Sequence, residues 1–96
     1  MGTVNITAMT VARGGSDIPL PILRATAASK NLASSGASAN TTLPAGGEWV
    51  RVLADTACSV KLSVGAGAAV VTDFRLAAGI PEYLPIDNNT YINVIE

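Results

Sequence analysis

Apolar and polar residues alternate with a period of two near the start of the chain, which is the pattern of a β-strand with one buried face. Within residues 3–11, Val4, Ile6 and Ala8 are separated by polar residues. Glycines and polar residues at 13–17 then end the segment as a turn. We therefore expect a half-buried strand at the beginning of the chain.

Two further alternating segments follow one another at 48–54 and 58–64. The first places Val50 and Val52 on one face. The second alternates four apolar residues with polar ones, and these apolar residues are Cys58, Val60, Leu62 and Val64. Clean alternation indicates one face in water, which is typical of antiparallel sheets. Because a short polar stretch joins the two segments, they predict a β-hairpin.

The last fifteen residues predict two more strands with a turn between them. Residues 82–86 form a short segment with prolines close by, which is typical of a sheet edge. Residues 91–95 place Ile92 and Val94 on one face. Residues 87–89, an aspartate and two asparagines, predict a turn in which asparagine adopts a positive φ.

Three stretches have a less regular pattern. Prolines at 19 and 21 exclude a helix and a central strand from residues 18–23, so an extended edge segment or an arm is expected there. Residues 25–42 are compatible with a short helix, a strand or a loop. Residues 68–76 also fit a short helix, but their β-branched residues and flanking glycines favour a strand.

Together these segments predict an all-β protein. Six to eight short strands, with turn signals about every ten residues, indicate a small antiparallel β-sandwich or a jelly-roll-like barrel. A chain of 96 residues has the length of one domain. We expect residues 1–96 to be a complete single β domain, with residues 1–24 as a candidate extended arm.

Charge is sparse and gives no reason to bind nucleic acid. Only 14% of the residues are charged, against about 25% in an average soluble domain, and the net charge is −1. The six cations are scattered along the chain, so no basic patch is predicted. No segment has the 18 apolar residues of a membrane span. We expect neither nucleic acid nor a membrane as a partner.

Catalytic residues are scarce as well. The chain has no histidine and one cysteine, so zinc sites and nucleophile–histidine pairs lack their ligands or base. Cys58 is interpreted as a small buried apolar group. No glycine-rich phosphate loop is present. We therefore expect no enzyme activity, no cofactor and no metal.

Two weaker sites are conceivable from residue types alone. Asp87, Asn88 and Asn89 offer oxygen ligands for calcium, although a simple turn explains them better. An aromatic residue beside a loop carboxylate would suit a sugar or peptide ligand, and Tyr83 next to Glu82 is the candidate pair. The four aromatic residues are otherwise interpreted as core and interface anchors.

The second half of the chain has a characteristic order of strands and turns. It begins at residues 49–61, with a Val-Arg-Val strand, a small polar turn, a cysteine and an alternating strand. It continues through residues 76–86, where leucine, alanines and glycine precede Glu82 and Tyr83. It ends with the strand at 91–95. This pattern over residues 48–96, which contains no catalytic residue, resembles small virion-associated proteins of tailed phages.

The resemblance implies a capsid decoration or cement protein that binds the major capsid protein on the capsid exterior of a virion and self-associates as a dimer or trimer. Such a protein would be made in the host cytoplasm. The expected contacts are in the N-terminal strand and the proline-containing segment, at Val4, Ile6, Ile18, Pro19, Leu20, Pro21 and Ile22.

Other functions stay open at this point. A head–tail connector, a tail component or a fibre accessory protein would fit the same composition. A small sugar-binding or peptide-binding β module is a further alternative. An enzyme is disfavoured by the missing histidine and the thin core expected of so short a chain.

Overall fold

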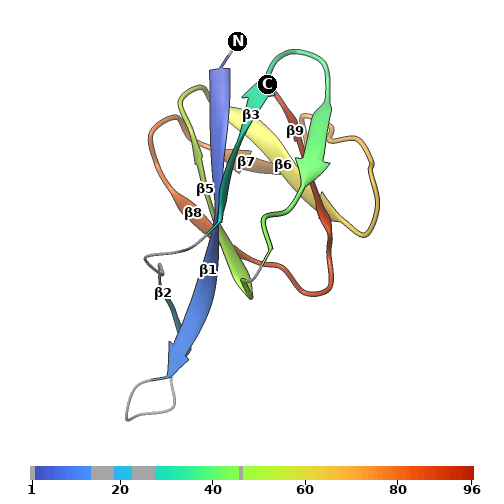
Figure 1. The fold of residues 1–96 in the computed structure, drawn as a ribbon. Helices are drawn as coiled ribbons and strands as arrows, with labels where there is room; N and C mark the ends of the chain where they lie inside the picture. Colours follow the sequence, from blue (N-terminus) through green and yellow to red (C-terminus); the bar gives the residue numbers. More distant parts are fainter. Residues whose placement is uncertain (1, 14–18, 23–27, 46) are drawn as a thin grey trace.

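The computed structural model describes residues 2–13, 19–22, 28–45 and 47–96, which form nine β-strands and no helix. The strands make two packed antiparallel sheets (Figure 1). The first sheet contains β2 (Pro19–Ile22), β1 (Gly2–Arg13), β5 (Trp49–Ala54) and β8 (Glu82–Pro85) in this order, and β3 (Ser29–Ser34) also pairs with β1. The second sheet has the order β4 (Ala39–Thr42), β9 (Tyr91–Ile95), β6 (Cys58–Ser63) and β7 (Phe74–Leu76).

The core lies between the two sheets and follows the alternating pattern of the sequence. Val4, Ile6, Val50 and Val52 of the first sheet have no exposed surface. They meet the apolar residues of the second sheet, which are Cys58, Val60, Leu76, Ile92 and Val94. The antiparallel β-sandwich predicted from the sequence is therefore confirmed.

The connection between β5 and β6 differs from the prediction. β5 pairs with β1 and β8, whereas β6 pairs with β7 and β9, so the expected hairpin is wrong. The turn instead arches from one sheet to the other. The Thr3 amide donates to Asp55 Oδ1 over 2.7 Å, which fixes the arch to β1. Turn residues indicate a reversal of the chain, but they do not show whether the next strand joins the same sheet.

Most of the stretch 25–42 is now assigned, while residues 25–27 lie outside the described residues. The described part forms β3 and β4, and Lys30 Nζ donates to the Thr42 carbonyl over 3.1 Å between them. Of the strand predicted over residues 68–76, only the last three residues form a strand, β7. The described residues form nine strands, whereas the sequence predicted six to eight. β3 and β4, for which the sequence predicted no single structure, account for the difference.

The long strand β1 has two parts with different surroundings. Residues 2–7 pair with β3, and residues 4–9 pair with β5, so this part is central in the first sheet. Residues 10–13 pair with β2 alone among the described strands. This end of β1 and β2 projects from the sandwich, and we call these two segments, 10–13 and 19–22, the arm (Figure 1). The molecule measures 44 Å along its longest axis and 27 and 24 Å across.

Candidate functional site

The loop formed by residues 64–73, between β6 and β7, lies against the outer face of the second sheet. Asn93 of β9 holds it from below. The side chain of Asn93 has no exposed surface, and its Oδ1 accepts a hydrogen bond from the Gly67 amide over 3.1 Å. Its Nδ2 donates to the Lys61 carbonyl and to Ser63 Oγ. A polar side chain that alternation would place in water is thus buried and fully bonded.

Other polar side chains fix the same loop at further points. Ser59 Oγ of β6, which is also buried, donates to the Val71 carbonyl over 3.0 Å. Ser38 Oγ accepts from the Ala69 amide over 2.9 Å, and Asn40 Nδ2 of β4 donates to the Gly67 carbonyl over 3.2 Å. Side chains from three strands and one loop therefore hold residues 64–73. Satisfied buried hydrogen bonds of this kind specify a single conformation.

The anchored loop and β7 expose four large apolar side chains. Val64 is 71% exposed, Val70 54%, Val71 61% and Phe74 50%. The buried position predicted for Val64 is wrong, because β6 ends at Ser63 and Val64 lies in the loop. We call these four residues the apolar loop surface. Single exposed apolar residues are ordinary, but a group of them on one loop is typical of a binding surface. Because the loop is already fixed, a partner would bind it without a large cost for ordering it.

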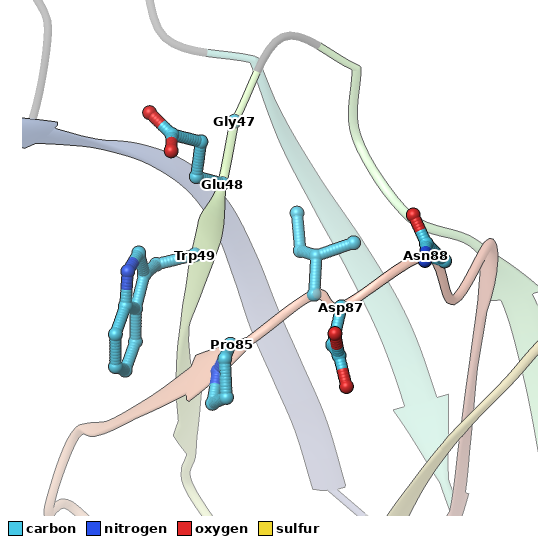
Figure 2. Close-up of a pocket in the computed structure, with 7 residues that line it drawn as sticks. Gly47, Glu48, Trp49, Pro85, Asp87 and Asn88 are labelled. Atoms are coloured by element: carbon cyan, nitrogen blue, oxygen red, sulfur yellow. The ribbon is translucent and has the colours of Figure 1, made fainter.

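A second feature is an open hollow of about 490 Å³ where the first sheet ends, between the start of β5 and the end of β8. Figure 2 shows the Trp49 indole beside the Pro85 ring. We call it the Trp49 hollow. Its lining residues are Gly47, Glu48, Trp49, Pro85, Ile86, Asp87 and Asn88.

One wall of the Trp49 hollow is a tight turn at residues 86–89. The Asn89 amide donates to the Ile86 carbonyl over 2.9 Å, and Asp87 and Asn88 have φ values of 49° and 67°. Two consecutive positive φ values with this hydrogen bond define a type I′ turn. The positive φ expected in this region is confirmed at Asn88. The turn connects β8 of one sheet with β9 of the other, so it closes no hairpin.

The hollow combines one aromatic face with two negative charges. Glu48 and Asp87 are exposed carboxylates, and none of the seven lining residues is a lysine or arginine. Arg51, two residues along β5 from Trp49, forms no ion pair with either carboxylate. Nε of Arg51 is buried and has no hydrogen-bond partner among the described residues. The hollow therefore suits a cationic group, which an indole face and carboxylates both attract.

The aromatic–carboxylate pair expected at Tyr83 and Glu82 does not form a site. Tyr83 lies opposite Arg51 in the sheet register, and Glu82 lies opposite the core residue Val52. Neighbouring residues of a strand point to opposite faces, so the two side chains diverge. Trp49 and Asp87 both line the hollow, and they are too far apart in the sequence for a local pattern to connect them.

The contact residues expected from the sequence have three different outcomes. Val4 and Ile6 are fully buried in the core, so their side chains have no surface for a partner and this part of the expected interface is corrected. Ile18 lies outside the described residues. The other four positions, Pro19, Leu20, Pro21 and Ile22, form β2 of the arm.

The remaining candidates for chemistry have structural explanations. Cys58 is buried in the core, as expected, and burial raises the pKa of its thiol. Asp87 and Asn88 form the turn described above. Within the described residues, no three His, Cys, Asp or Glu side chains gather into a possible metal site. The same residues contain no helix long and apolar enough to cross a membrane.

Searches against family models, curated proteins and solved structures found no significant match to this chain.

Proposed function

We propose that this chain is a non-enzymatic structural protein of a larger assembly, and that it acts as a capsid decoration protein bound to the major capsid shell of a tailed phage. The observation that carries the proposal is the apolar loop surface. Val70, Val71 and Phe74 are half exposed or more, on a loop that buried polar groups hold in place.

The loop surface suits a permanent contact with another protein. Burying apolar area contributes roughly 25 cal/mol per Å², so each covered side chain adds to affinity. The anchors Asn93 and Ser59 stabilise the loop before any partner binds. A fixed apolar surface with sparse charge is therefore expected to bind a partner in a manner that depends little on salt.

The choice of a capsid shell as the partner comes from the sequence resemblance over residues 48–96. The loop and β7 lie within these residues. A stable contact buries about 600–1,000 Å² on each partner, and a shell presents the same site many times. The expected location is the capsid exterior, where a compact sandwich can cover the joints between shell subunits.

The experiment is co-sedimentation with purified shells of candidate tailed-phage capsid proteins that lack their own decoration protein. The test variant is the double substitution Val71→Asp and Phe74→Asp, which places charge on the apolar loop surface. The matched control is Ile80→Asp, because Ile80 is 53% exposed and lies outside this surface.

We expect the unaltered chain and the Ile80→Asp control to sediment with the shells in many copies per particle. The double variant should lose at least about 90% of this binding, since an unpaired charge buried in a contact is costly. Circular dichroism should show that all three proteins are folded. A folded double variant that binds like the unaltered chain, or an unaltered chain that ignores every shell, would overturn the proposal.

A further inference from the structure

The outer face of the first sheet, which is turned away from the core, carries one charged side chain in the rows that join β1, β5 and β8. Val50 and Val52 of β5 are buried in the core, so Arg51 between them points to the outer face. In the sheet register Arg51 lies between Thr7 of β1 and Tyr83 of β8. The other residues of these rows on this face are uncharged, and they are Asn5, Met9, Trp49, Leu53 and Pro85. Arg51 therefore has no carboxylate neighbour in these rows.

The guanidinium group of Arg51 has no hydrogen-bond or ion-pair partner within the described part of the chain. Its Nε is shielded from water and makes no hydrogen bond, and neither terminal nitrogen is bonded to a described residue. Arginine is always charged and has five N–H donors. Because Nε is shielded, we expect a ligand to bind the two terminal nitrogens. Their fork matches the two oxygens of a carboxylate.

Aromatic side chains flank Arg51 on the same face. Tyr83, opposite Arg51 on β8, is 45% exposed. Trp49 lies two residues away along β5 and is half-buried. An aromatic ring offers an apolar surface, and tyrosine adds a hydroxyl that can donate or accept a hydrogen bond. This combination suits a ligand that carries a carboxylate together with a ring of C–H groups and hydroxyls.

Uncharged polar groups lie on the other side of β1 on this face. Ser29 of β3 lies opposite Thr7, and Asn31 lies opposite Asn5. Both β3 residues are exposed, and Asn5 Nδ2 donates to Ser29 Oγ over 3.0 Å and to Asn31 Oδ1 over 2.9 Å. From β3 to β8 the face is three strand spacings wide, about 14 Å. It therefore offers fixed polar groups to a ligand longer than a single ring.

The position of Arg51 favours a saccharide over a peptide. β5 pairs with β1 on one side and with β8 on the other, so it has no open edge at Arg51. Extended peptides gain affinity from backbone hydrogen bonds to an open sheet edge. A ligand at Arg51 meets side chains alone, and sugar hydroxyls and ring faces can be bound by side-chain donors and aromatic rings.

We propose that the outer face of the first sheet binds an acidic saccharide, whose carboxylate is held by Arg51 and whose ring packs against Tyr83. The charges are complementary, since Arg51 is a cation on an otherwise uncharged part of the face. This inference does not rest on the capsid proposal. Arg51 and Tyr83 belong to the first sheet, whereas the apolar loop surface belongs to the second sheet and its loop.

The experiment is a titration with three probes, followed by calorimetry and by the NMR shifts of backbone amides. The first probe is an oligosaccharide of alternating glucuronate and N-acetylglucosamine. The second is an uncharged N-acetylglucosamine oligomer, and the third is a glutamate peptide with the same number of carboxylates as the first. We expect the acidic saccharide to bind at least about tenfold more tightly than either of the others, because it alone offers a ring and a charged acceptor together.

The shifts should gather at the amides of Arg51, Tyr83 and their neighbours in the sheet. An unaltered chain that does not bind the acidic saccharide, or shifts confined to the second sheet, would overturn the proposal. Equal binding of the glutamate peptide would show that the site recognises carboxylates without sugar, and it would overturn the saccharide assignment.

Substitutions test the two assigned contacts. Arg51→Gln should weaken binding of the acidic saccharide at least about tenfold, because it removes the charged donor. Lys61→Gln is the matched control, since Lys61 is an exposed cation on β6 in the other sheet and its loss changes the net charge equally. The control should bind like the unaltered chain. Equal losses for the two variants would show attraction by net charge alone and would overturn the site.

Tyr83→Ala is a second variant at an exposed position, so it should fold as the unaltered chain does. Its binding should be weaker because the ring contact is lost, and circular dichroism checks that it is folded. A folded Tyr83→Ala variant with unchanged affinity would contradict the assigned ring contact. The double variant Val71→Asp and Phe74→Asp should bind the saccharide normally, so failure of the capsid proposal and failure of this one are distinguishable.

Discussion

The arm and the loop of residues 64–73 both lie outside the main sandwich, but different forces hold them. The arm is held by backbone hydrogen bonds along one edge of β1, where residues 10–13 pair with β2. The loop has no ladder of its own. Buried side chains such as Asn93 and Ser59 hold it against the second sheet.

This difference has a functional meaning. A backbone edge can pair with any strand of suitable register, so its pairing has little side-chain specificity. A loop fixed by specific side chains presents one defined surface, which favours a particular partner. The loop is therefore the region on which the proposed contact with a shell protein rests. The predictions below test whether the regions depend on the core and on each other.

The largest effect is expected from the core, on which both regions depend. Ile6 of β1 is fully buried, and Ile6→Ala should lower the free energy of unfolding by about 2–5 kcal/mol, since it leaves a cavity. Urea unfolding is the measurement, and Cys58 labelling by a thiol reagent supports it because the folded chain buries this thiol. Val70→Ala on the exposed loop is the control, with an expected change within about 0.5 kcal/mol. Equal effects of the two substitutions would contradict the assigned core.

A smaller and more local effect is expected at Asn93. Asn93→Ala removes the acceptor of the Gly67 amide and a donor to the Lys61 carbonyl, so it should cost about 1–3 kcal/mol. Hydrogen exchange at the Gly67 amide should accelerate strongly, while the amides of the arm keep their rates. Asn40→Ala is the control, because this exposed residue makes a single bond to the loop and should have a weaker effect. Acceleration spread evenly over the chain would argue against a separately anchored loop.

The smallest effect is expected at the end of the molecule opposite the arm, where the two termini lie close together (Figure 1). Glu96 Oε2 accepts hydrogen bonds from Ser34 Oγ over 2.7 Å and from the Gly2 amide over 2.8 Å. The Ser34 bond first, and the Gly2 bond with it, lower the pKa of the Glu96 carboxyl in the folded chain. The ionised carboxylate therefore stabilises the fold above the ordinary pKa of glutamate, and this contribution is lost as the pH falls through the lowered value.

Thermal unfolding as a function of pH measures this contribution. The unaltered chain should have a slightly higher midpoint than Glu96→Gln at neutral pH, and the two midpoints should converge in acid. A difference between the two midpoints that stays constant down to strongly acidic pH would contradict the assigned hydrogen bonds.

The sequence by itself determined the fold class, the strands that form the core and the face that each of them buries. Val4, Ile6, Val50 and Val52 repeat at every second position, and this period permits burial of one face only. The prolines at 19 and 21 placed their segment at an edge for an equally local reason, because proline has no N–H for a central ladder. The burial of Cys58 followed from the same alternation.

Only the tertiary structure decided which strands share a sheet, and therefore which surfaces exist. Residues 55–57 have the composition of a hairpin turn, yet they join two sheets, because strand pairing depends on contacts between distant segments. Alternation predicts Asn93 and Ser59 on the face in water, but both are buried because the loop of residues 64–73 covers them. The Trp49 hollow joins the start of β5 to the turn after β8. Periodicity reports the faces of single strands, and it carries no information about which strands become neighbours.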